Sequence, residues 1–170
     1  MTAFDEFRTQ RHKLEWARLD KTLPGGIHRP QKPGDIGWDL EAMEDVLIRP
    51  MESVDIPVNA RIHLPPDMYA DLRNRSSMAR RGLYVDHGLI DNGYRGPLYV
   101  FVRNMALPPH SYEASSEYND RTVLVRAGER IAQLVFHKAV PVWDLEVDEI
   151  DIDTVRGETG FGSTNGGGAS

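Results

Sequence analysis

The stretch SVDIPVNARIHL, residues 53–64, decides the fold class of this chain. Apolar side chains occupy alternate positions in two runs, first Val54, Ile56 and Val58 and then Ile62 and Leu64. A two-residue apolar period is typical of a strand with one buried face. Similar apolar pulses recur at about ten-residue spacing between turn residues, with little sustained helical period. The pattern therefore predicts an all-β barrel or sandwich.

Further strand candidates lie on both sides of this stretch. They are Val46–Ile48, Leu83–Val85, Leu89–Ile90, Leu98–Val102, Val123–Val125, Ile131–Phe136 and the alternating run Val140–Val147. Two segments fit more than one element. Residues 14–19 fit either a first strand or a loose helical stripe. Pro65–Asn74 fits either one or two helical turns or a strand that runs to Arg75.

Composition excludes several classes of protein. The 170 residues suffice for one domain and contain no cysteine, which excludes disulfides, thiolate metal sites and a cysteine nucleophile. Asp and Glu outnumber Lys and Arg by 26 to 20, which argues against binding to duplex nucleic acid. There is no apolar run of about 20 residues, no apolar signal-peptide core and no zinc-binding histidine spacing. We therefore expect a cytoplasmic protein that binds neither a membrane nor nucleic acid.

Two segments carry side chains suited to nucleotide chemistry. Arg75-Ser76-Ser77 combines a guanidinium with two hydroxyls, which suits a phosphate, although an isolated triplet also fits an exposed turn. The segment Gly88–Gly96, GLIDNGYRG, resembles a hairpin tip in which Asp91 directly follows an apolar pair. Asp91 fits either a general base or a carboxylate that caps the turn, and Tyr94 can stack on a sugar or a base.

Two later segments add to this set. In Gly128–Phe136, GERIAQLVF, Gln133 interrupts an apolar strand and binds either a neighbouring strand or a ligand phosphate. The glycine-rich C-terminal segment contains Arg156, Phe161, Gly162 and Ser163. It fits either a disordered tail or an arm that orders over a ligand.

Taken together and in this order, the motifs resemble those of the trimeric dUTPases. The five counterparts are Gly37–Leu40, Arg75–Ser77 with Ala79, Gly88–Gly96, Gly128–Gln133, and Arg156-Gly157 with Gly160–Thr164. The resemblance covers about residues 14–164. It implies a jelly-roll, β-clip type of β-fold with a short helical turn, a homotrimer with shared active sites, and a flexible C-terminal arm. The corresponding segments would be an extension (1–13), a β domain (14–150) and the arm (151–170).

The resemblance also implies hydrolysis of dUTP to dUMP and pyrophosphate. Asp91 would deprotonate the attacking water, Tyr94 would pack on the deoxyribose, and Asp39 would support the site. The substrate would be bound by Arg75, Ser76, Ser77, Gly88, Ile90, Tyr94, Gln133, Arg156, Phe161, Gly162 and Ser163. Mg²⁺ would be held by the phosphates and by water, with no direct protein ligand.

Two departures from the dUTPase pattern leave alternatives open. The RSS triplet is the form found in the related dCTP deaminases, yet Phe101 occupies the position of their essential glutamate. A gapless count back from Asp91 puts Val85 where dUTPases have an asparagine that helps to read uracil, with Asp86 or His87 as substitutes. The alternatives are therefore a dCTP deaminase, a pyrophosphatase for another pyrimidine, or a nucleotide-sensing protein that binds a partner.

Overall fold

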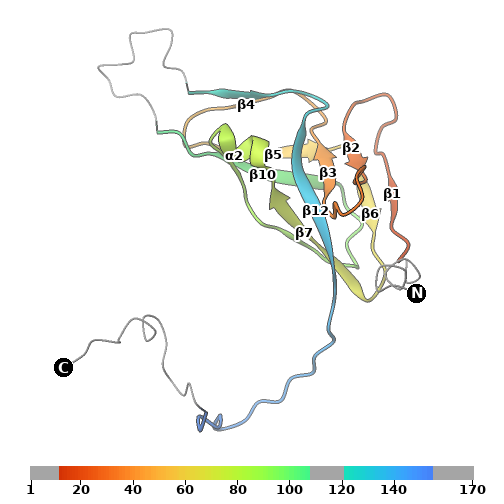
Figure 1. Cartoon of the computed structure of the whole chain (residues 1–170), viewed down its shortest axis with the longest axis vertical. Coiled ribbons are helices and arrows are strands. Elements are labelled where there is room, and N and C mark those ends of the chain that lie inside the picture. The colour runs from red at the N-terminus through yellow and green to blue at the C-terminus, as the bar shows by residue number, and fades with distance from the viewer. Residues whose placement is uncertain (1–11, 108–120, 155–170) are drawn as a thin grey trace, which may run out of the picture. The chain divides into compact units, whose positions relative to one another are not determined.

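The computed structural model describes residues 12–107 and 121–154. The chain divides into two compact units, one that ends at Val140 and one that begins at Pro141. All strands and the one helix of the described residues belong to the first unit (Figure 1). The strands are β1 (Glu15–Ala17), β2 (Gly26–His28), β3 (Trp38–Glu41), β4 (Val46–Ile48), β5 (Ser53–Val58), β6 (Arg61–His63), β7 (Met68–Asn74), β8 (Leu83–Val85), β9 (Leu89–Ile90), β10 (Leu98–Asn104), β11 (Val123–Val125) and β12 (Arg130–Lys138). The helix is α2 (Ser76–Arg80).

The described strands pair only in antiparallel fashion. The largest sheet has the order β2-β3-β12-β7-β9, and a second sheet has the order β5-β10-β8. Two ribbons, β1-β6 and β11-β4, complete the first unit (Figure 1). β12, with 9 residues, lies between β3 and β7 and so forms the middle of the largest sheet. The predicted all-β fold class is confirmed.

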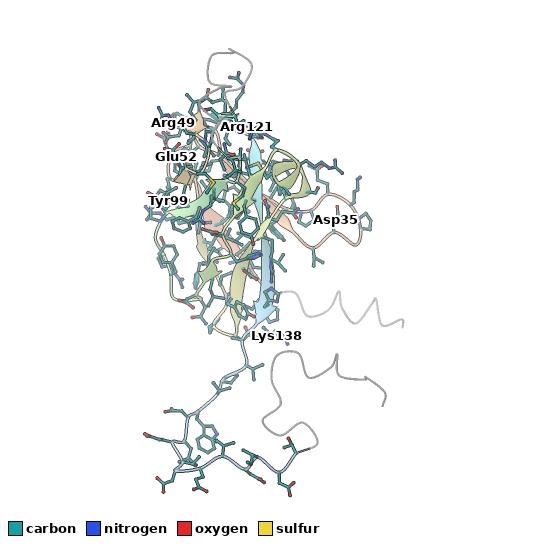
Figure 2. All side chains as sticks on the ribbon, turned by 90° about the vertical axis from the view of Figure 1, so that its left-hand side faces the viewer. Asp35, Arg49, Glu52, Tyr99, Arg121 and Lys138 are labelled. Carbon is teal, nitrogen blue, oxygen red and sulfur yellow. The ribbon has the colours of Figure 1, made fainter. Side chains whose placement is uncertain are left out.

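The alternating stretch that decided the fold class forms the core as expected. Ile56 and Val58 of β5 are fully buried and lie opposite Val100 and Leu98 of β10. Burying each of these side chains contributes about 1.5–3 kcal/mol relative to leaving it in water. The intervening residues of β10 face outward, as Tyr99 does (Figure 2).

Of the two structures that fit Pro65–Asn74, the chain adopts the strand. Ala70 and Leu72 of β7 are buried, whereas Asp71 between them is only half-buried and faces away from the core. The helix begins only at Ser76 and is anchored by the buried side chain of Met78. No helix in the described parts of the chain has the length and apolar character to span a membrane.

The strand expected over Val140–Val147 is absent, so that prediction was wrong. β12 ends at Lys138 (Figure 2), and residues 139–154 contain no strand. Val142 and Trp143 are 89% and 83% exposed. A strand needs a hydrogen-bonded neighbour, and apolar alternation alone does not supply one. The domain boundary expected at residue 150 stays a prediction.

Candidate functional site

In the largest sheet, the carboxylate of Asp39 binds three donors. Asp39 lies on β3 directly opposite Gln133 of β12. Its Oδ1 accepts a hydrogen bond from Gln133 Nε2 and forms an ion pair with Arg75 Nε, both at 3.1 Å. Its Oδ2 accepts a hydrogen bond from Arg130 Nη1, also at 3.1 Å. The side chain of Asp39 is only 14% exposed, so these donors replace the water that burial has removed.

A β-bulge brings Arg130 to the same face of the sheet as Gln133. In a regular strand, residues three apart point to opposite faces. The pairing of β12 with β3 shifts register just after Arg130, and a bulge adds one residue to a strand at such a point. As a result, the next residue, Ile131, is fully buried while Arg130 reaches the carboxylate of Asp39.

Arg75 joins the same cluster from the end of β7. Its Nη1 donates a hydrogen bond to the carbonyl oxygen of Arg130 at 2.7 Å, in addition to the ion pair with Asp39. A guanidinium carries five N–H donors in one plane. Because Asp39 and the Arg130 carbonyl use only some of the Arg75 donors, the others can bind an anion. Ser76 and Ser77 lie beside Arg75 in the first turn of α2 and are exposed. The cluster is thus suited to binding phosphate.

A second group of predicted residues surrounds a pocket of about 190 Å³. Asp91 directly follows β9, which pairs with β7 through Ile90 and Ala70. The wall of the pocket is mainly apolar and includes Leu72, Ile90 and Phe101. Among the described residues that line the pocket, Asp91 is the only acidic one. This arrangement offers an apolar surface for a base or sugar with a single carboxylate at its rim.

The loop after β9 holds the ring of Tyr94 at this pocket. The Tyr94 hydroxyl donates a hydrogen bond to the carbonyl oxygen of Pro97 at 2.7 Å. A Cβ atom added to Gly96 would overlap the Tyr94 ring, so a side chain at this position would make the ring shift. Just before β9, the carbonyl oxygen of Gly88 accepts a hydrogen bond from the Leu72 N–H at 2.9 Å. The segment from Gly88 to Pro97 is therefore fixed at both ends.

The two groups lie near opposite ends of β7. Arg75 follows the last residue of β7, whereas Asp91 follows Ile90, the partner of Ala70. Extending that register places Asp91 beside Tyr69, six residues from Arg75. At about 3.4 Å per residue the two positions are about 20 Å apart along the strand. The structure thus gathers Asp39, Arg75 and Gln133 in one place and Asp91 and Tyr94 in another.

The positions that depart from the dUTPase pattern lie outside the pocket, with one exception. Val85 is fully buried in β8. The N–H of Asp86 donates to the carbonyl oxygen of Phe101 at 3.0 Å, and His87 Nδ1 lies 3.1 Å from the carbonyl oxygen of Leu72. Phe101 itself lines the pocket and cannot transfer a proton. Residues 85–87 therefore give no evidence for a changed base preference.

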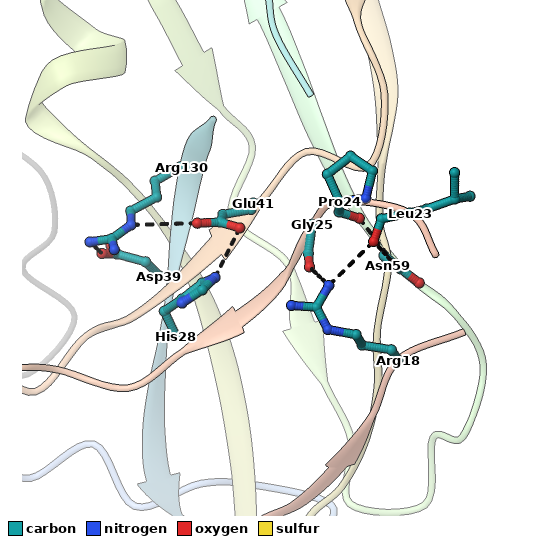
Figure 3. Close-up of polar contacts among 9 residues, drawn as sticks. All are labelled: Arg18, Leu23, Pro24, Gly25, His28, Asp39, Glu41, Asn59 and Arg130. Atoms are coloured by element: carbon teal, nitrogen blue, oxygen red, sulfur yellow. Dashed lines mark hydrogen bonds and ion pairs between the residues drawn. The ribbon is translucent and has the colours of Figure 1, made fainter. Parts of the chain in front are cut away.

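Sequence reasoning missed three residues of the Asp39 cluster, namely Arg130, Glu41 and His28. Glu41 Oε1 lies 3.7 Å from Arg130 Nε, and Glu41 Oε2 lies 2.9 Å from His28 Nε2 (Figure 3). Strict alternation places Arg130 and Gln133 on opposite faces. The only sign of a bulge in the sequence was Gly128, a glycine shortly before β12. In the structure, Gly128 has a φ of +80° and forms the turn that leads into this strand.

The remaining predictions concern the C-terminal segment and a metal. Arg156, Phe161, Gly162 and Ser163 lie outside the described residues, and their roles stay predictions. Within residues 12–107 and 121–154, no three His, Asp or Glu side chains gather as a metal site. The Asp39 cluster offers guanidinium and amide donors, which suit phosphate oxygens better than a cation. The role of Mg²⁺ stays a prediction.

Comparisons with known proteins agree with the family resemblance of the motifs. A family model described as dUTPase matches residues 24–165. The chain is 38% identical over 159 residues to the deoxyuridine 5'-triphosphate nucleotidohydrolase of Thermobifida fusca, covering 91% of this chain and 79% of that protein. The corresponding protein of Gloeothece citriformis is 36% identical, with coverages of 89% and 96%. A Staphylococcus bacteriophage 80alpha dUTPase, solved with dUpNHpp, has a TM-score of 0.73 at 26% identity and coverages of 89% and 97%.

Proposed function

The chain belongs to the dUTPase family, and from this premise we propose how its residues hydrolyse dUTP to dUMP and pyrophosphate. The reaction consumes one water molecule and breaks the bridge between the α- and β-phosphates. It needs an aligned water, a base that takes the proton of that water, and positive groups that stabilise the charge on the phosphates. The two groups of residues at the ends of β7 provide these parts.

Asp91 is the general base. The observation that carries this assignment is that Asp91 is the only acidic residue among the described residues lining the pocket. Its carboxylate takes a proton from the water as the water attacks. Tyr94 packs on the deoxyribose, and the backbone of Gly88 and Ile90 contacts the base. Because the loop is fixed by backbone contacts, recognition of the base depends little on side chains.

The cluster around Asp39 binds the triphosphate. Arg75 and Gln133 donate to phosphate oxygens, with Ser76 and Ser77 beside them, and Asp39 holds the first two in position. When Mg²⁺ is bound with the substrate, it would supply further positive charge at the phosphates that Arg75 and Gln133 hold. Arg156, Phe161, Gly162 and Ser163 close over the bound nucleotide and exclude water.

The complete site combines residues of different subunits. About 20 Å of strand separates Asp91 from Arg75, and groups so far apart cannot act on the same phosphate. A homotrimer resolves this if the pocket of one subunit faces the Asp39 cluster of the next. The separation along β7 supports this arrangement, which the family resemblance also implies.

The first experiment measures pyrophosphate release from dUTP by Asp91→Asn. Asparagine keeps the shape of the side chain and cannot take a proton, so we expect activity to fall about 10²- to 10⁴-fold. Asp86→Asn is the matched control, because it makes the same chemical change five residues away and outside the pocket. It should keep activity within about twofold of wild type. Near-wild-type activity of Asp91→Asn would disprove the assignment of the base.

The same assay, run with dCTP, dTTP and UTP and with ammonia detection, tests the substrate. We expect pyrophosphate from dUTP alone and ammonia from none of the four. Ammonia from dCTP would instead require a second proton-transfer group near Phe101, where the described residues of the pocket wall supply no carboxylate besides Asp91.

A further inference from the structure

Four charged side chains alternate in sign across the polar face of the largest sheet. Arg75 pairs with Asp39, Asp39 with Arg130, and Arg130 with Glu41. His28 of β2 follows, with its Nε2 2.9 Å from Glu41 Oε2 in an ion-pair contact and not a hydrogen bond (Figure 3). The side chains of Asp39 and Glu41 are only 14% and 16% exposed, so solvent screens these charges weakly.

We propose that Glu41 is a positioning residue for triphosphate binding, an inference that rests on the proposed function. Glu41 Oε1 forms an ion pair with Arg130 Nε at 3.7 Å, which is too long for a hydrogen bond, and Arg130 Nη1 in turn donates a hydrogen bond to Oδ2 of Asp39. Asp39 then presents Arg75 and Gln133 to the phosphates. Glu41 itself does not contact the substrate.

The geometry explains why Arg130 needs a second carboxylate. Its side chain is 38% exposed, and with Asp39 alone it is held at one nitrogen. Two carboxylates on two sides of the guanidinium fix its plane. Without Glu41, Arg130 can rotate away from Asp39, and the Asp39 carboxylate loses the donor on Oδ2. Arg75 and Gln133, which both bind Oδ1 of Asp39, are then held by a carboxylate that is itself less fixed.

The fold itself depends little on Glu41. β3 is held by its backbone pairing with β2 and β12 and by Leu40, which is fully buried and lies opposite Ile27 and Ala132. Glu41 sits on the other face of β3, among polar side chains. Removing its carboxylate is therefore expected to change the cluster more than the sheet.

The test separates binding of the phosphates from binding of the base. Calorimetry on the full chain measures the affinity of Glu41→Ala for dUpNHpp with Mg²⁺ and for deoxyuridine, which has no phosphate. We expect about tenfold weaker binding of dUpNHpp and unchanged binding of deoxyuridine. Glu41→Gln keeps the volume and one acceptor and should lose about threefold. It carries the test if Glu41→Ala is unstable.

A double-mutant comparison tests the route through Arg130. In an Arg130→Met background, Glu41→Ala should cost no further affinity for dUpNHpp, because the interaction that it removes is already gone. Asp45→Asn is the matched control, since it also removes a carboxylate paired with an arginine, Arg126, at 3.8 Å. It should bind dUpNHpp within twofold of wild type.

Three results would overturn the proposal. They are wild-type affinity of Glu41→Ala for dUpNHpp, an equal loss for deoxyuridine, and a loss of the same size with and without Arg130. Pyrophosphate release by the wild-type enzyme is measured in parallel. A wild-type enzyme that binds dUpNHpp without cleaving dUTP would contradict the proposed function. The affinities of the Glu41 variants would still test the role of Glu41, because they do not depend on cleavage.

Discussion

At the scale of single residues, the position of Tyr94 depends on the absence of a side chain at Gly96. The Tyr94 ring lies where a Cβ of residue 96 would be, and its hydroxyl is held by the carbonyl oxygen of Pro97. The ring cannot move aside without losing that hydrogen bond. The absence of a Cβ at residue 96 therefore determines the shape of the pocket on the side proposed to bind the sugar.

Gly96→Ala should displace the Tyr94 ring. We expect KM for dUTP to rise about tenfold, because the sugar loses its packing surface. Gly93→Ala in the same loop is the matched control, since no atom lies within 4 Å of a Cβ added there. Steady-state kinetics on both variants check this. Equal KM values for the two variants would contradict the role given to Gly96.

The two halves of the site differed in how well sequence could anticipate them at this scale. Asp91 and Tyr94 are close in the chain, so one loop holds both. The hairpin predicted around them was wrong, because β9 pairs with β7, whereas β10 pairs with β5 and β8 in another sheet. Asp39 and Gln133 come from two strands and Arg75 from the residue after a third, and only the family resemblance joined them in advance. Arg130 was missed because alternation placed it on the opposite face, and a bulge reverses that rule.

At the scale of elements, the alternation of apolar and polar residues predicted strands that have one buried face and one exposed face. β5 and β10 alternate over 6 and 7 residues and were expected. β2 and β3 have 3 and 4 residues, too few for a period to emerge beside nearby glycines and prolines. Val140–Val147 has the pattern and forms no strand, because alternation reports which face is apolar and says nothing of a hydrogen-bonding partner.

The connection between β1 and β2 is held by one buried amide. Asn59 is fully buried, and its Nδ2 donates to the carbonyl oxygens of Asp20, Leu23 and Pro24 at 2.6, 3.1 and 3.0 Å (Figure 3). Its Oδ1 accepts a hydrogen bond from the Asp20 N–H at 2.9 Å. These bonds provide partners for backbone groups of a connection that contains no helix or strand.

Asn59→Ala should therefore destabilise the fold. It removes four hydrogen bonds to partly buried backbone groups of this connection, and we expect the free energy of unfolding to fall by about 3 kcal/mol. Asn92→Ala removes a single hydrogen bond to Pro66 and should cost less than about 1 kcal/mol. Urea unfolding of both variants measures the difference. A loss below 1 kcal/mol for Asn59→Ala would show that the loop is held by other contacts.

At the scale of the whole molecule, the proposed active site is a property of the assembly. Each chain contributes a pocket with Asp91 and a phosphate cluster with Arg75, and the two lie about 20 Å apart along β7. Variants that lack different halves should therefore complement each other when they share a trimer.

Mixing tests this directly. Asp91→Asn and Arg75→Ala should each be nearly inactive alone. Refolded together in equal amounts, they should recover about a quarter of wild-type activity, since about one site in four then joins an intact Asp91 to an intact Arg75. Mixing without refolding is the control and should recover nothing. No recovery after refolding would mean that each site is built from a single chain.

The length of β7 determines how far Arg75 lies from Asp91, which its sequence pattern does not suggest. A strand can lose or gain two residues and still keep every side chain on its proper face. In this chain such a change would preserve the core of the subunit and would move Arg75 relative to Asp91 by about 7 Å. A subunit altered in this way would fold well and still fail to match its neighbours. In the proposed trimer, the 7 residues of β7, which pair with β12 along their whole length, also set the distance between the two halves of a shared site.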